Sequence, residues 1–111
     1  MTTFADAFNP QGNTITFLAA TSAPSPVQVL GDSTSAPQYR VVNAGSSLVF
    51  LGYGRSAAQA TAAAIVVATS GAAMPLLPGT VEVFTIIPNT WFTGITASGT
   101  SQVYITPGLG S

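Results

Sequence analysis

The stretch WFTGITASGTSQVYIT, Trp91–Thr106, gives the clearest indication of the fold of this chain. Two runs rich in β-branched and aromatic residues flank the dipeptide Ser98-Gly99. A short Gly-containing dipeptide between two such runs is typical of a two-residue turn that joins antiparallel strands. The stretch therefore predicts a β-hairpin in which Ala97 lies opposite Thr100.

The predicted hairpin has large apolar side chains on both faces. In this register Phe92 lies opposite Ile105 on one face, because side chains alternate along a strand. Trp91, Ile95 and Tyr104 then share the other face, and neither face carries a charge. A hairpin with one solvated face is normally polar on that face. One face can meet an opposing sheet. Three interpretations remain open for the second face. It has lone surface aromatics or a covering loop, it contacts another chain, or it stacks against carbohydrate.

Similar short runs recur along the rest of the chain, separated by clusters of Pro, Gly, Asn and Ser. The runs are Thr14–Ala20, Val27–Leu30, Tyr39–Asn43, Leu48–Leu51, Ile65–Thr69 and Val81–Ile86. Several short strands at this spacing predict an all-β domain, an antiparallel β-sandwich or a barrel. Pro24 and Pro26 favour an edge position for the strand that follows them, because proline cannot donate to a ladder.

One segment departs from the β pattern. Ser56-Ala57-Ala58-Gln59 fits the S-x-x-Q capping box, and alanines dominate the residues that follow, up to Ala64. Alanine has the highest helix propensity. The segment is either a short helix around residues 57–64 or an ordered Ala-rich loop, so the domain contains at most one short helix.

The first twelve residues are expected to form an arm. Phe4 and Phe8 are its apolar anchors, and Asn9-Pro10-Gln11-Gly12 is typical of a turn. A terminus with two phenylalanines is usually tied down, either on its own domain or on a neighbour. We therefore expect an N-terminal arm, residues 1–12, followed by a single domain, residues 13–111.

The charge content is unusually low. Charged residues make up 5% of the 111 residues, compared with about 25% in typical domains. A net charge of −1 gives little self-repulsion, which favours association. The chain has two arginines, no lysine and no cysteine. Nucleic-acid binding is not expected, because it requires several phosphates to be neutralised together. Disulfides and thiolate metal sites are excluded.

The residue types also argue against catalysis. There is no histidine, and the three carboxylates, Asp6, Asp32 and Glu82, are scattered without the pattern of a dyad or a metal cage. Hydroxyl groups abound, but a hydroxyl nucleophile needs a base, and neither histidine nor lysine exists to serve as one. We expect no enzyme activity, no catalytic or metal-binding residues, and no cofactor.

A weak nucleotide-binding motif is rejected on its context. Gly52-Tyr53-Gly54-Arg55-Ser56-Ala57 matches G-x-G-x-x-A, but no acidic residue lies about 20 residues further on. The plainer interpretation is a turn in which Gly52 and Gly54 permit positive φ angles. The apolar segment Ala57–Leu77 is interrupted by polar residues and Pro75, so no membrane span is expected. No apolar h-region follows the first residues, so no secretory signal is expected either.

The region from Val41 to Gly110 resembles small bacteriophage capsid decoration proteins, also called cement or head-stabilisation proteins. The matching patterns are VVNAGSSLVFLGYG, SAAQATAAA, LLPGTVEVFTI and WFTGITASGTSQVYITPGLG. They cover well over half of the chain, but they are patterns of strand and turn without a catalytic signature. The first forty residues add little to the resemblance.

The resemblance implies a jelly-roll-like β-sandwich on the outer capsid surface of a virion. It also implies a homotrimer that clamps adjacent subunits of the major capsid protein and does not touch the packaged DNA. Interface residues are inferred from size and charge, since large side chains dominate interface energy. They are Phe4, Phe8, Arg40, Arg55, Trp91, Ile95 and Tyr104.

Other functions remain open on the sequence alone. The chain could be a tail, fibre or head-completion component of a phage, which would share the same structural character. It could also be a carbohydrate-binding module that uses the aromatic side chains of Trp91, Tyr39 or Tyr53. Copy number on the particle and glycan binding distinguish these functions.

Overall fold

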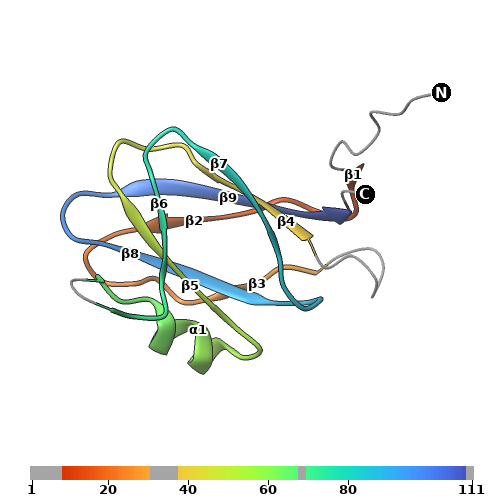
Figure 1. Cartoon of the computed structure of the whole chain (residues 1–111), viewed down its shortest axis with the longest axis horizontal. Helices are drawn as coiled ribbons and strands as arrows, with labels where there is room; N and C mark the ends of the chain where they lie inside the picture. Colours follow the sequence, from red (N-terminus) through yellow and green to blue (C-terminus); the bar gives the residue numbers. More distant parts are fainter. Residues whose placement is uncertain (1–8, 31–37, 68–69, 110–111) are drawn as a thin grey trace.

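The chain folds into two antiparallel sheets packed face to face, with one short helix on the outside (Figure 1). The computed structural model describes residues 9–30, 38–67 and 70–109. We name each sheet after one of its central strands, the β9 sheet and the β8 sheet.

The β9 sheet has the order β1-β9-β4-β7, and β2 pairs with the same strand β9. Its strands are β1 Asn9–Pro10, β2 Ile15–Ala19, β4 Gln38–Asn43, β7 Val81–Thr85 and β9 Ser101–Leu109. The β8 sheet has the order β3-β8-β5-β6. Its strands are β3 Val27–Gln28, β5 Val49–Gly54, β6 Met74–Leu76 and β8 Trp91–Thr96. Helix α1 spans Ala57–Ala63.

The strand pairs are nested. Strand β2 pairs with β9, β3 with β8, β4 with β7, and β5 with β6, all antiparallel. This is the pairing of one long hairpin, centred between β5 and β6, that has rolled up so that successive pairs alternate between sheets. The result is the jelly-roll arrangement of two Greek keys. The expected all-β, jelly-roll-like sandwich with one short helix is confirmed.

The predicted hairpin at Ser98-Gly99 is wrong. Strands β8 and β9 belong to different sheets, and residues 97–100 cross from one sheet to the other. The crossing is fixed by side chains: the Ser101 hydroxyl accepts from the Ser47 N–H and donates to the Ser47 carbonyl, both at 3.0 Å. Strand β9 instead pairs along its length with β4 and β2, which puts the apolar residues of β8 and β9 on facing sheets. Burial across the sandwich has overridden the local turn signal.

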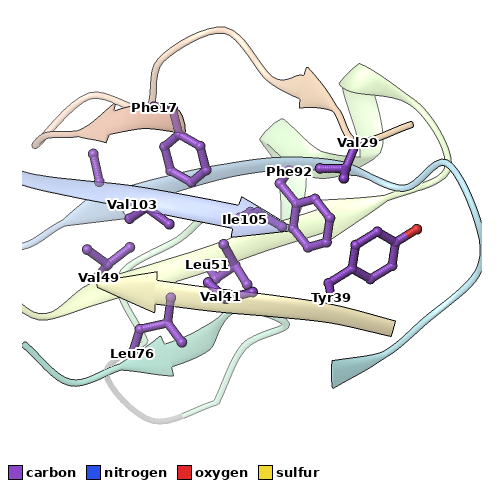
Figure 2. Packing of buried hydrophobic residues seen from close by; sticks show 11 residues of the cluster. Phe17, Val29, Tyr39, Val41, Val49, Leu51, Leu76, Phe92, Val103 and Ile105 are labelled. Carbon is purple, nitrogen blue, oxygen red and sulfur yellow. The ribbon is translucent and has the colours of Figure 1, made fainter. Parts of the chain in front are cut away.

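The core lies between the two sheets (Figure 2). The β8 sheet contributes Leu51 and Phe92, and the β9 sheet contributes Tyr39 and Ile105. The rings of Tyr39 and Phe92 meet edge to face, with centroids 5.1 Å apart. The Tyr39 hydroxyl donates to the Ile87 carbonyl at 2.6 Å, so this buried phenol has a partner.

A second buried polar group forms hydrogen bonds between the two sheets within the core. The side-chain amide of Asn43, which is fully buried, donates to the carbonyls of Ser47 and Leu76, each at 2.9 Å. Leu76 belongs to β6, in the opposite sheet. Such bonds are needed where a polar group leaves water. No buried side-chain N or O atom within the described residues lacks a hydrogen-bond partner.

Several local expectations differ from the structure. Asn9–Pro10 forms the short strand β1 against β9, where a turn was expected. Residues 65–67 of the expected strand Ile65–Thr69 are irregular, and residues 68–69 lie outside the described ranges. The expected edge position after Pro24 and Pro26 is confirmed, because β3 is an edge strand of the β8 sheet.

Candidate interaction surface

The outer face of the β8 sheet is covered by the chain itself. Helix α1 lies on this sheet, on the side away from the β9 sheet, and packs against β5 and β8 (Figure 1). Ala60 and Ala64 are the buried residues of the helical segment, at 0% and 6% exposure. Phe50, on the same outer side of β5, is also buried. The helix therefore covers part of this face, where Trp91 and Ile95 remain half-buried.

The helix begins at the residue that the sequence predicted. Ser56 is the N-cap, and its hydroxyl accepts from the Gln59 N–H at 3.2 Å. The Gln59 side-chain carbonyl in turn accepts from the Arg55 N–H at 2.8 Å. This reciprocal pair differs from the usual capping box in one respect: the second bond reaches the residue before the N-cap.

Two glycines allow the helix to lie directly on β5. A Cβ atom on Gly52 would lie 2.5 Å from the Ala60 carbonyl oxygen, and one on Gly54 would lie 2.5 Å from the Gln59 Cβ. The expected reason for these glycines, positive φ angles, is wrong: neither of them has a positive φ. They are glycines because the backbone of the helix passes too close for any side chain.

The outer face of the β9 sheet, in contrast, has exposed apolar residues beside polar ones such as Thr16 and Arg40. Five residues that point away from the core form what we call the open patch. They are Leu18, Val42, Val81, Val83 and Tyr104. The cross-strand partners Tyr104, Val42 and Val81 form one continuous row over three adjacent strands. Tyr104 is 42% exposed, and Val83 is 49% exposed.

The orientation of β7 puts its valines in the open patch. Phe84 packs against the core, so the neighbouring same-side residue, Glu82, also points to the core side of the strand. Val81 and Val83 must then point outward, and both are exposed. An alternating V-E-V pattern would normally be interpreted with the valines buried and the glutamate in solvent. Strand β7 has the reverse arrangement, which is why sequence reasoning missed these two residues.

The structure separates the inferred interface residues that belong to one predicted hairpin face. Trp91 and Ile95 lie on the outer side of the β8 sheet and are half-buried, whereas Tyr104 lies on the outer side of the β9 sheet. Their expected shared face is therefore wrong, for the same reason as the hairpin. Phe4 and Phe8 lie outside the described residues.

The two arginines each line a surface pocket. Arg40 lies beside the open patch, in a pocket of about 340 Å³ that it lines with Pro10, Gly12, Thr14 and Thr106. Both arginines are exposed, and in the described part of the chain neither forms an ion pair with Glu82.

Arg55 lines a smaller pocket of about 230 Å³, together with Tyr53, Gly54, Gln59, Ile86 and Ile87. An exposed guanidinium can donate two parallel hydrogen bonds to a carboxylate of another molecule. Tyr39 is fully buried, so it is not available for stacking against a sugar.

Within residues 9–30, 38–67 and 70–109, no three His, Cys, Asp or Glu side chains are grouped as metal ligands. The same residues include no helix of the length and apolarity that crossing a membrane requires.

Comparisons with protein-family models, with curated proteins and with solved structures find no match.

Proposed function

We propose that this chain is a bacteriophage capsid decoration protein. It binds the outer surface of a phage head as a homotrimer and clamps neighbouring subunits of the major capsid protein, which stabilises the shell. The proposal joins the resemblance of residues 41–110 to such proteins with the physical character of the surface. The work of the chain is then binding alone, without a chemical step.

The open patch is the observation that carries this proposal. The chain covers one outer sheet face with its own helix but leaves valines and a tyrosine exposed on the other. An exposed apolar patch on a folded domain commonly marks a binding surface. Here the patch is flanked by Arg40, whose guanidinium is available to a carboxylate of the partner.

Repetition of the contact is part of the mechanism. A specific interface of ordinary size buries about 800 Å² on each partner, which is more than a face of short strands alone supplies. Additional contacts are therefore expected from the arm and from neighbouring copies. On a shell, each copy that is held at two sites binds more tightly than either contact alone would allow.

The direct test is to count copies on the particles that contain the chain. Quantitative mass spectrometry of purified particles is expected to give hundreds of copies per head, in a fixed ratio to the main shell protein. A handful of copies at one vertex would instead assign the chain to a tail, fibre or head-completion role. Absence from particles, with glycan-array binding that is lost in Trp91→Ala, would favour a carbohydrate-binding module.

A reconstitution experiment tests the proposed surface. Heads stripped of the chain are incubated with the wild type, with Tyr104→Ser, or with Ala62→Ser, a control on the exposed side of α1. We expect the wild type and the control to rebind and to raise the temperature at which heads release DNA. Tyr104→Ser should rebind more weakly. Equal rebinding of all three would exclude the open patch as the contact surface.

A further inference from the structure

Strand β7 forms an edge of the β9 sheet that no other strand of the described residues covers. Strand β7 ends the order of the β9 sheet and has five residues with no proline. The edges of the β8 sheet are shorter: β3 follows Pro26, and β6 contains Pro75. Strand β2, at the opposite edge of the β9 sheet, also has five residues and no proline, but the chain that follows it turns toward β8, where the Ala20 carbonyl accepts from the Thr96 N–H at 2.9 Å. A proline-free exposed edge is a template for another strand.

The hydrogen bonds to β4 show which backbone groups of β7 are free. The Asn43 N–H donates to the Thr80 carbonyl at 3.1 Å, which sets the phase of the ladder just before β7 begins. Hydrogen-bonded and non-hydrogen-bonded pairs alternate in an antiparallel ladder. Glu82 and Phe84 therefore bond to β4, and the N–H and C=O groups of Val81, Val83 and Thr85 point to the open edge.

We propose that two copies of this chain pair through β7, antiparallel, about a two-fold axis at Val83. In this register Val83 lies opposite Val83 of the second copy, and Val81 lies opposite Thr85. Each residue with free backbone groups meets another such residue, so all of them form ladder bonds. The two β9 sheets become one continuous sheet, and the two open patches become one surface.

Charge disfavours the register centred on Glu82, and geometry disfavours the registers centred between two residues. Centring the axis on Glu82 would place two carboxylates directly opposite each other, and like charges at such positions are destabilising. Centring the axis between two residues would set free backbone groups against groups already bonded to β4. The register centred on Val83 instead places Glu82 opposite Phe84, and the net charge of −1 opposes association only weakly.

The expected dimer is weak. A five-residue strand pair buries less than the roughly 800 Å² per partner of a stable interface. We expect a substantial dimer fraction at about 0.1–1 mM protein, an affinity typical of small transient contacts. This contact does not depend on the proposed capsid function: it uses the backbone edge of β7, whereas the proposed contact with the shell uses the outward side chains of the open patch.

Cysteine cross-linking tests the register, because the chain has no cysteine of its own. At a hydrogen-bonded pair the Cα atoms are about 5.5 Å apart, within the range that a disulfide can bridge. Val83→Cys should therefore form disulfide dimers under mild oxidation. Val81→Cys is a matched control with similar exposure, 45% against 49%. Its two copies would lie four residues apart along the strand, about 13 Å, and should not cross-link.

The rates at which the two variants form disulfide dimers test the proposed register. We expect Val83→Cys dimers to form at least tenfold faster than Val81→Cys dimers at the same concentration. Equal rates would show that the thiols meet by random collision, and faster linkage of Val81→Cys would show a different register. Either result would overturn the proposal.

Sedimentation of the full chain tests the backbone pairing. The wild type should show a concentration-dependent dimer that is lost in Val83→Pro, because proline removes an N–H from the free edge. Val83→Thr keeps that N–H and should keep the dimer. Circular dichroism confirms that each variant is folded. A wild type that stays monomeric at 1 mM would disprove the pairing, whatever the chain does on a phage head.

Discussion

The two outer sheet faces of this domain are built from similar strands but have opposite surroundings. On the β8 sheet, glycines at 52 and 54 let helix α1 lie against the strands, and Phe50 is buried there. On the β9 sheet, Tyr104 and the valines of β7 face outward without cover from the described residues. The chain covers one sheet face with its own helix and leaves the other uncovered within the described residues. The exposed apolar side chains of the open patch therefore need a separate explanation.

The difference also separates residues that contribute to the free energy of folding from residues that contribute to the free energy of binding. Residues on the covered face contribute to the stability of the isolated domain, because they are removed from water when the chain folds. Residues on the open patch contribute little until a partner arrives. Substitutions on the two faces should therefore divide cleanly into those that change folding and those that change binding.

The largest effect is expected at Phe50. Phe50→Ala removes a ring that is 8% exposed and leaves a cavity on the covered face, so the free energy of unfolding should fall by about 3 kcal/mol. Urea denaturation followed by tryptophan fluorescence measures the change. The matched substitution on the open patch is Tyr104→Ala, which should cost about 1 kcal/mol or less. Equal costs would show that the two faces do not differ in burial.

Gly52→Ala should come next. The new Cβ would lie 2.5 Å from the Ala60 carbonyl oxygen, so helix α1 must move away from β5, at a cost of about 2 kcal/mol. Chemical denaturation gives the cost, and far-ultraviolet circular dichroism shows whether the helix is retained. At Gly79 a Cβ has open space, and only the φ of +73° is unfavourable. Gly79→Ala should cost about 1 kcal/mol, and a larger loss there than at Gly52 would contradict the packing argument.

Ser56→Ala tests the cap of the covering helix. Loss of the bond from the Gln59 N–H should lower the free energy of unfolding by about 1 kcal/mol. The control is Ser98→Ala, an exposed serine in the crossing between the sheets, which should change it by less than about 0.5 kcal/mol. Thermal denaturation of the two variants side by side makes the comparison. If the melting temperatures of both variants shift equally, the Ser56 cap makes no specific contribution to stability.

The smallest effect on folding is expected on the open patch. Val81→Thr keeps a β-branched side chain on an exposed strand and should change the free energy of unfolding by less than about 0.5 kcal/mol. The same exchange at Val49, which is fully buried, leaves a hydroxyl in the core and should cost about 2 kcal/mol. Retention on a hydrophobic-interaction column should fall for Val81→Thr and stay unchanged for a folded Val49→Thr protein. An unchanged retention of Val81→Thr would argue against an accessible patch.

The local elements of the fold could be predicted from sequence because their signals are local. β-branched runs located most of the strands, and the S-x-x-Q pattern located the start of α1 at Ser56. Strand β6 was missed because Pro75 stands in its middle, and proline argues against a strand interior. As an edge strand, β6 needs hydrogen bonds on one side only, so the proline is tolerated.

The pairing of strands and the candidate surface could not be predicted in the same way. Ser98-Gly99 fits a tight turn, but whether its flanking strands pair is decided by partners that lie far away in sequence, such as β4 for β9. The outward direction of Val81 and Val83 depends on Phe84 reaching the core, which no pattern within β7 specifies. Tyr104 was predicted to be an interface residue from its size, although the face predicted for it was wrong.

The nested strand pairs also have a kinetic consequence. The outermost pairs, β1 and β2 with β9, join residues near opposite ends of the described chain, so they can form only after the inner pairs have brought those ends together. Domains dominated by such distant pairings fold in milliseconds to seconds, slowly for their size. Stopped-flow refolding should show this, and unfolding should be slow as well, since the closing pairs must open first. A chain closed in this way would stay folded through brief exposure to heat, for reasons of rate as well as of equilibrium.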